Sequence, residues 1–185
     1  MGPRDSATSN ALLDAAERVL RNEGYAAASS RRVAEEAGLK QQLVYYYFQT
    51  MDELLLATFR RRTERALAKL EVDAASMRPV KAMWETLSNS SDGKLSFEFM
   101  ALANHHEGIR AEIARFVTTS RRMEAEVLDR LGAEERAKLG PVTPAAAAFL
   151  LSAVSLMLGR EEATGIEEGH ADVRALIAAM MARFD

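Results

Sequence analysis

The sequence contains no cysteine and only four prolines among its 185 residues. Without cysteine the chain cannot form disulfide bridges, thiolate metal sites or a cysteine nucleophile. It also lacks an uncharged apolar run of about 18 residues, which a membrane-spanning helix would need. Residues 1–10 are polar and lack the apolar stretch of a secretory signal, so we expect a cytoplasmic protein without membrane contact.

The composition favours helices over strands. Hydrophobic residues make up 48% of the chain, which is enough for a core. Alanine, leucine, glutamate and arginine are abundant, and these residues predict an all-α protein. The net charge of −3 is unusual for a DNA-binding protein, and residues 1–65 carry ten basic and nine acidic residues. Because phosphate binding needs a local positive face, this balance neither supports nor excludes DNA binding.

Apolar periodicity, capping residues and helix breakers predict helices over most of the chain. Thr8 or Ser9 can cap the first helix, and Gly24 can end it. Polar loops are expected at residues 88–93 and in two later connections, 132–143 and 165–169. The expected helices span residues 8–22, 29–38, 40–48, 52–75, 79–87, 97–106, 109–131, 144–158 and 172–184.

Residues 29–48 have the pattern of a helix-turn-helix, in which a glycine turn separates two short helices. Gly38 can adopt the positive φ that this tight turn needs. The apolar residues that should pack inward at helical spacing are Val33, Ala34, Ala37, Leu39, Val44 and Phe48. The outer surface and its flanks would then carry Gln41, Gln42, Leu43, Tyr45 and Tyr47.

These outward residues have the chemistry of DNA recognition. Glutamine can bind adenine through two hydrogen bonds, and an apolar tip such as Leu43 can contact a thymine methyl group. Tyrosine hydroxyls can bind phosphate while their rings pack against sugars. Three consecutive tyrosines on one short helix cannot all be buried, because successive side chains diverge by about 100°. The alternative is a packed helical hairpin in which the tyrosines only provide bulk.

The segments VAEEAGL, VYYYF and DELL, which lie between Val33 and Leu55, resemble the N-terminal signature of the TetR family of helix-turn-helix transcriptional regulators. The resemblance implies a DNA-binding domain at residues 1–50 and a larger helical domain at residues 51–185 for ligand binding and dimerisation, joined by the helix at 52–75. It further implies a homodimeric repressor that binds a palindromic operator and is released by an apolar or amphipathic small molecule. No cofactor and no catalytic residue are expected.

The resemblance also assigns roles to single positions. Ser29 holds the N-cap place of a phosphate-contacting residue, and Arg31 lies where some members reach a base or a phosphate. Tyr45 and Tyr47 match places that contact the DNA backbone, whereas Tyr46 is expected to pack inside. The residues expected to contact DNA are Ser29, Ser30, Arg31, Lys40, Gln41, Gln42, Leu43, Tyr45 and Tyr47.

Three positions depart from the family pattern. Lys40 replaces the usual serine or threonine cap of the recognition helix, and Tyr47 stands where histidine is common. Met51 stands where a phosphate-binding lysine is common, so the salt-dependent part of DNA binding should be weaker. Our hypothesis is that Lys40 restores it from one turn away. An alternative function follows from Met51 and the near-neutral first part, namely a protein-interaction module with a degenerate helix-turn-helix.

Large apolar side chains gather in the central helices, and methionine fills irregular space and tolerates varied ligands. With the resemblance, they imply a pocket for an apolar or amphipathic molecule lined by Met83, Trp84, Leu87, Phe97, Met100, His105 and Phe116. The alternative for these residues is an ordinary core.

The histidines do not predict a metal site or an enzyme. His105 and His106 are adjacent, and adjacent side chains on a helix point about 100° apart, so they would not bind one ion together. An active site around His105, His106 and Glu107 would lack a nucleophile–base pair, a phosphate loop and metal-ligand spacing. His170 is expected at the surface.

Residues 145–158 are too apolar on all sides for the surface helix of a monomer. With the last helix, they predict half of a four-helix dimer interface, in which small alanines allow close approach. The residues expected there are Phe149, Leu150, Ala153, Leu156, Met157, Leu176 and Met180. The alternative is the buried central helix of a monomer. A dimer would match a palindrome with half-sites about one helical turn apart.

Overall fold

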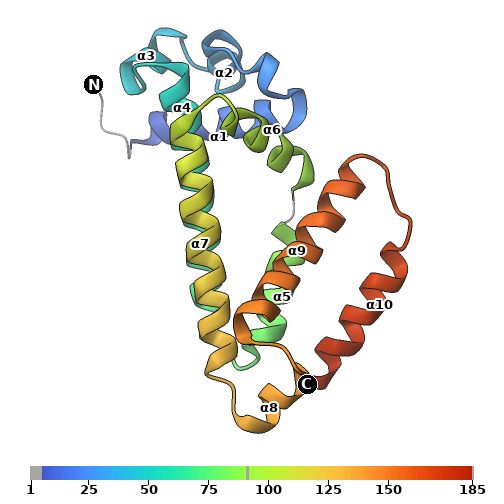
Figure 1. Cartoon of the computed structure of the whole chain (residues 1–185). Helices are drawn as coiled ribbons and strands as arrows, with labels where there is room; N and C mark the ends of the chain where they lie inside the picture. The colour runs from blue at the N-terminus through green and yellow to red at the C-terminus, as the bar shows by residue number, and fades with distance from the viewer. Residues whose placement is uncertain (1–5, 91, 185) are drawn as a thin grey trace. The chain divides into compact units, whose positions relative to one another are not determined.

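The computed structural model describes residues 6–90 and 92–184, except for the side chains of residues 89 and 90. Every regular element within these residues is helical, which confirms the predicted all-α fold (Figure 1). The elements are α1 (Ala7–Glu23), α2 (Ser30–Glu36), α3 (Gln42–Tyr47), α4 (Met51–Ala74), α5 (Pro79–Ser90), α6 (Gly93–Ala103), α7 (Glu107–Asp129), α8 (Ala133–Lys138), α9 (Pro144–Ala163) and α10 (His170–Met181), with short 3-10 helices η1 (Tyr25–Ala27) and η2 (Ala182–Phe184).

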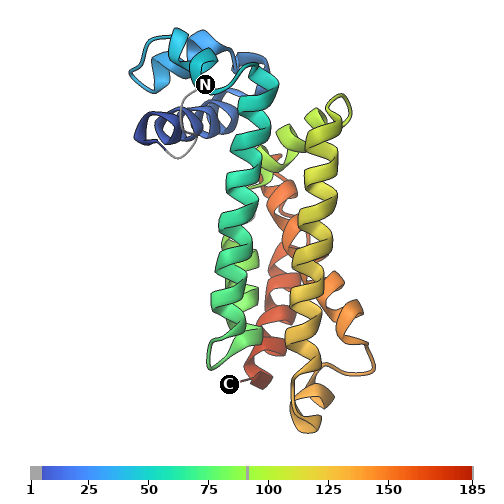
Figure 2. The ribbon, with the colours of Figure 1, turned by 90° about the vertical axis from the view of Figure 1, so that its left-hand side faces the viewer.

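The described chain divides into two compact units. The first contains the residues up to Glu64 together with Lys94–Ile113, and the second contains Arg65–Gly93 together with the residues from Ala114 onward. The long helices α4 and α7 contribute residues to both units, and Figure 2 shows their uninterrupted course. No helix in the described ranges combines the length and the hydropathy that a membrane span requires.

Several helix boundaries differ from the sequence-based expectation; α6 begins earlier, at Gly93, and α9 ends later, at Ala163. The cap of α1 is Ser6, whose Oγ accepts the backbone N–H of Ser9 at 3.1 Å, so the expected cap lay too far along the chain. Helix α5 continues to Ser90, into the segment expected to be a loop. Helix α8 was not predicted, because it is short and polar and none of its residues is buried.

The core of the first unit has two parts. One packs α1, α2 and α3 against the start of α4 through Leu12, Leu13, Ala15, Ala16, Val33, Ala34, Val44, Tyr47, Phe48 and Leu54. The other joins α1, α4, α6 and the start of α7 through Leu20, Leu55, Phe59, Leu95, Phe99, Leu102, Ala103 and Ile109. Full burial of a large apolar side chain contributes roughly 1.5–3 kcal/mol, so these contacts hold the helix-turn-helix in a fixed arrangement.

The core of the second unit combines the end of α4 with α5, α7, α9 and α10. Its buried residues are Leu70, Val80, Met83, Val127, Leu128, Ala147, Ala148, Leu151, Ile177 and Met181, and Trp84 packs against them. The first residue of α6, Gly93, approaches the backbone of α9 so closely that a Cβ atom there would lie 1.9 Å from the carbonyl oxygen of Gly159. The hydroxyl of Ser155 also donates a hydrogen bond to the carbonyl of Leu87 at 2.7 Å, which fixes α5 against α9.

A buried carboxyl group also links two helices of the second unit. Glu124 of α7 is 2% exposed and accepts a hydrogen bond from the hydroxyl of Ser152 on α9 at 2.8 Å. Burial raises the pKa of the Glu124 carboxyl, because an apolar environment disfavours the charged form. The bond with Ser152 and the charge of Arg121 act in the opposite direction.

Candidate nucleic-acid interface

The helix-turn-helix forms from α2, a tight turn and α3, as the sequence predicts. Ser29 caps α2, since its Oγ accepts the backbone N–H of Arg32 at 3.2 Å. Gly38 has a φ of 67°, which lets the chain reverse direction after α2. The N–H of Leu39 then donates to the carbonyl of Ala34 at 2.9 Å and closes the turn. The geometry therefore places α3 directly after α2 on a shared core.

Several of the residues expected to contact DNA are exposed on this unit. Arg31, Lys40, Gln41 and Gln42 are exposed, Leu43 is half-buried, and Tyr45 is 50% exposed. Arg31 forms no ion pair with any residue that the structure describes, so its charge is available to a ligand. Helix α3 has no side-chain cap, in agreement with the departure at Lys40.

Tyr46 and Tyr47 exchange the places expected for them. Tyr47 is 9% exposed and belongs to the core, whereas Tyr46 is 53% exposed. Val44 is fully buried, and a residue three positions later returns to the same side of a helix, which is the reason that Tyr47 points inward. The two rings pack edge to face with centroids 5.0 Å apart. Tyr47 is therefore removed from the outer surface, and Tyr46 takes its place.

Ser30 also lies elsewhere than expected, because its side chain is buried rather than presented to a ligand. It is 6% exposed, at the first residue of α2. Its Oγ accepts hydrogen bonds from Nε2 of Gln41 at 2.8 Å and from the hydroxyl of Tyr45 at 3.0 Å. Ser30 therefore holds the side chains of Gln41 and Tyr45 by hydrogen bonds. Sequence spacing gave no sign of this contact, which joins residues of different helices.

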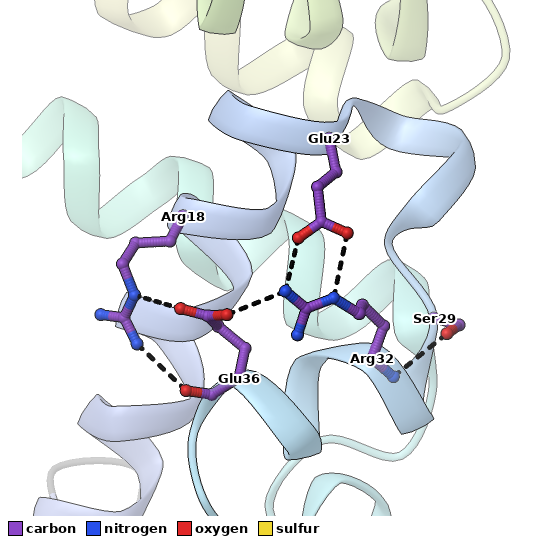
Figure 3. Close-up of polar contacts among 5 residues, drawn as sticks. All are labelled: Arg18, Glu23, Ser29, Arg32 and Glu36. Carbon is purple, nitrogen blue, oxygen red and sulfur yellow. Dashed lines mark hydrogen bonds and ion pairs between the residues drawn. The ribbon is translucent and has the colours of Figure 1, made fainter.

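An ion network braces α2 against α1 (Figure 3). The guanidinium of Arg32 donates to both carboxylate oxygens of Glu23, at 2.9 and 2.5 Å, and to Glu36 at 2.9 Å. Arg18 donates from Nε to the other oxygen of Glu36 at 2.8 Å. Arg32 is thus saturated by carboxylates, in contrast to its neighbour Arg31. Arg32 therefore stabilises the packing of α2 on α1, whereas Arg31 is available to a ligand.

The brace shifts the titration of Glu36. Hydrogen bonds from Arg18 and from Arg32 hold the pKa of the Glu36 carboxyl below its ordinary value. A carboxyl whose pKa is lower in the folded state stabilises the fold above its unfolded pKa of about 4.3, and this contribution disappears as the pH falls through the folded pKa. The brace should therefore be complete at neutral pH and lost in acid.

We expect Glu36→Gln to lower the Tm slightly at pH 7, because the charged acceptor of both arginines is removed. As the pH falls below about 4.3, the Tm difference from the unsubstituted protein should shrink toward zero. Thermal unfolding followed by circular dichroism between pH 7 and pH 3 measures this convergence. Glu35→Gln is the matched control, since Glu35 is exposed and forms no ion pair with a described residue. A pH-independent Tm difference for Glu36→Gln would contradict the brace.

The residues expected to line a pocket are divided between the two units. In the second unit, Met83 is 1% exposed within the core, while Trp84, Leu87 and Phe116 are half-buried. In the first unit, Phe97, Met100 and His105 are exposed. Two open grooves of about 240 and 280 Å³ lie instead beside the ends of α4 and α7, and none of the seven residues lines them. The core alternative therefore applies to Met83.

The histidines have separate surroundings. His105 is exposed, whereas Nδ1 of His106 accepts the backbone N–H of Ile109 at 3.2 Å and caps α7. His170 is 6% exposed, with Nε2 lying 2.7 Å from Oε2 of Glu161, so the expectation of a surface position was wrong. Among the described residues no group of three or more acidic, histidine or cysteine side chains is arranged to hold a metal ion.

The residues expected at a dimer interface form an apolar exposed set on α9 and α10. Phe149, Leu150, Leu156, Met157 and Leu176 are between 41% and 62% exposed. The two other residues of this set, Ala153 and Met180, are half-buried, and Met180 packs against the core of the second unit. Large apolar groups concentrated on two helices are typical of an interaction surface rather than of a free face.

Comparison with known proteins shows which family the helix-turn-helix region resembles. The family model of bacterial regulatory proteins, tetR family, matches residues 12–58. The HTH-type transcriptional regulator BetI of Rhizobium meliloti (strain 1021) is 29% identical over 124 residues, which are 64% of this chain and 61% of that protein. The match thus spans less than two thirds of that relative's length.

Solved structures share the fold over nearly the whole chain. A TetR transcription regulator from Haloarcula marismortui ATCC 43049 has a TM-score of 0.77 at 18% identity, covering 95% of this chain and 97% of that chain. A candidate transcriptional regulator from Saccharomonospora viridis, solved in complex with choline, has a TM-score of 0.75 at 16% identity, covering 95% and 92%. With the helix-turn-helix geometry, the match identifies residues 12–58 as a helix-turn-helix region of the tetR type found in bacterial regulatory proteins, and the chain shares its fold with these solved structures.

Proposed function

We propose that the protein is a ligand-responsive transcriptional regulator, a repressor that binds a palindromic operator as a homodimer and leaves it when an apolar or amphipathic small molecule binds. Residues 1–50 would bind DNA, and residues 51–185 would bind the effector and the second protomer. The observation that carries the proposal is the set of exposed polar side chains on a rigidly packed helix-turn-helix, namely Arg31, Lys40, Gln41, Gln42 and Tyr45.

The charges of the helix-turn-helix support base reading more than general attraction to phosphate. Arg32 is held by Glu23 and Glu36, and Met51, where the family commonly has a lysine, is half-buried against the core. Arg31 and Lys40 remain as exposed cations beside the glutamines of α3. Because each neutralised phosphate releases counterions, few phosphate contacts should give DNA binding with a shallow salt dependence.

The apolar face of α9 and α10 supports dimerisation, and the family fold supports a small-molecule effector. Exposed groups as large as Phe149, Leu150 and Leu176 would be covered when two protomers pair. The Saccharomonospora viridis structure was solved in complex with choline, which favours a small molecule as the class of effector. Its identity is the part of the proposal that a ligand screen on the operator complex would supply.

Selection of bound sequences from a random duplex pool tests the proposal. We expect recovery of a palindrome with one preferred half-site spacing, as two-fold symmetry requires. Recovery of nothing above background, with the protein folded and dimeric, would contradict DNA regulation and favour the interaction-module alternative. Binding of the recovered duplex at several salt concentrations then reports the number of phosphate contacts.

Arg31→Ala tests whether Arg31 makes one of the phosphate contacts that the salt dependence reports. If Arg31 contacts a phosphate, its removal should weaken binding to all duplexes similarly and reduce the salt slope by about one. Arg122→Ala is the matched control, because Arg122 is an exposed arginine of the second unit and should leave the slope unchanged. Equal slopes for Arg31→Ala and the unsubstituted protein would exclude the phosphate contact.

A further inference from the structure

We infer that Ser30, Gln41 and Tyr45 form one hydrogen-bonded unit that fixes the amide of Gln41, so that Gln41 presents its side-chain oxygen and its second N–H to the major groove and selects adenine. This inference rests on the proposed function, since it names the base class that the proposed DNA-binding surface reads. Ser30 is a positioning residue in this scheme, and Gln41 is the residue that contacts the base.

The geometry of the unit is set by three residues of the helix-turn-helix. Ser30 is the first residue of α2 and is 6% exposed, so its hydroxyl lies beneath the surface. Gln41 stands at the N-cap of α3, and its Nε2 donates to Oγ of Ser30 at 2.8 Å. Tyr45 lies one turn further along α3, and its hydroxyl donates to the same oxygen at 3.0 Å. The side chains of Gln41 and Tyr45 are therefore held on one face of α3.

The hydrogen bond from Nε2 of Gln41 to Ser30 places the amide nitrogen inward and the amide oxygen outward. A serine hydroxyl oxygen has two acceptor lone pairs, and Gln41 and Tyr45 occupy both. The amide nitrogen of Gln41 is thereby directed to Ser30, while the amide oxygen has no partner among the described residues. Gln41 itself is exposed, so this oxygen is available as a hydrogen-bond acceptor.

An acceptor selects among the bases by the groups they present in the major groove. Adenine and cytosine each present an amino donor there, whereas guanine presents two acceptors and thymine presents an acceptor and a methyl group. Recognition of adenine alone uses both the oxygen and the nitrogen of a glutamine amide. Nε2 of Gln41 carries two N–H groups, and Ser30 engages one of them. The other remains available with the amide oxygen, so we expect adenine, which presents both a donor and an acceptor, to be preferred over the other three bases.

The same unit changes the role expected for Tyr45. Its hydroxyl proton is directed to Ser30, so the hydroxyl is not free to donate to a phosphate. Tyr45 is 50% exposed, and the bond to Ser30 holds its ring in place near Gln41. Among the tyrosines of α3, Tyr46 is then the one whose exposed side chain can reach the DNA backbone.

The test measures binding to the selected operator with each of the four bases at the position where Gln41→Ala loses its preference. The unsubstituted protein should prefer adenine to each of the other three bases by about ten-fold. Ser30→Ala should reduce this preference to about two-fold or less, because the amide is free to turn and to donate to guanine. Ser30→Thr retains the hydroxyl that accepts the bond from Gln41 and should keep the preference.

One control variant and a stability measurement separate positioning from general structure. Gln42→Ala should leave the base preference at the Gln41 position intact, since Gln42 makes no bond to Ser30. A merely structural role of Ser30 would lower the affinity for all four duplexes equally and would lower the Tm measured by circular dichroism.

The outcomes distinguish this inference from the proposed function. Failure of the unsubstituted protein to select any duplex overturns the function itself. Specific binding with a preference for guanine at the Gln41 position, or a base preference that Ser30→Ala leaves unchanged, overturns the inference and leaves the function standing. Specific binding in which Gln41→Ala alters no position also overturns it.

Discussion

Replacing Leu150 and Leu176 together with glutamate is expected to convert the protein from dimer to monomer and to lower its affinity for a palindromic operator by about 100- to 1,000-fold. Both side chains are more than half exposed, at 52% and 62%, so the substitutions should not disturb the protomer core. In the proposed interface each glutamate would become a buried, unpaired charge, which costs about 3–5 kcal/mol. A monomer could then bind only one of the two half-sites of the operator at a time.

Sedimentation velocity and titration of the selected duplex measure the two effects. Ile166→Glu is the matched control, because Ile166 is an apolar residue that is 48% exposed and lies outside α9 and α10. It should remain dimeric and keep its affinity. A double variant that stays dimeric with unchanged operator affinity would show that another surface joins the protomers.

Gly93→Ala is expected to destabilise the protein by about 1–3 kcal/mol, which is the usual cost of overpacking. The new Cβ would lie 1.9 Å from the carbonyl oxygen and 2.6 Å from the carbonyl carbon of Gly159, so backbone would have to move. The new Cβ would also lie 2.9 Å from the Cβ of Ala163, so a small shift of residue 93 would not relieve both contacts. In a protein of this size, each kcal/mol lowers the Tm by about 2–4 °C.

Gly132→Ala provides the comparison for this measurement. Gly132 has an ordinary φ of −60°, and nothing lies within 4 Å of the Cβ that alanine would add. Both substitutions reduce the freedom of the unfolded chain in the same way, so the difference between their Tm values isolates the steric cost at Gly93. Equal Tm values for the two variants would mean that α6 and α9 can separate without loss of packing.

The helix-turn-helix could be predicted from sequence because its determinants are local. Gly38 marks the turn, and Val44 and Phe48 mark the buried side of α3 at a spacing of four residues. The same spacing argument, applied one residue earlier, would have placed Tyr47 inside. The family pattern instead suggested Tyr46, and the periodicity of the helix was the better guide.

Features that depend on contacts between helices could not be read from the sequence. Ser30 reaches Gln41 and Tyr45 across the turn, and neither the composition nor the spacing of these residues indicates which of them is buried. The gathering of methionine and aromatic residues likewise predicts a pocket no better than it predicts a core, and Met83 belongs to the core. Helix α8 has no apolar side, so periodicity had nothing to detect.

The aromatic residues give each unit its own spectroscopic label. Trp84 is the only tryptophan in the chain, and it packs in the core of the second unit. All four tyrosines, Tyr25, Tyr45, Tyr46 and Tyr47, belong to the first unit. Excitation at tryptophan wavelengths would therefore report on the second unit, the proposed site of effector binding and dimerisation, and tyrosine emission on the first unit, which contains the helix-turn-helix. The unmodified protein thus allows ligand and operator binding to be followed separately in one cuvette.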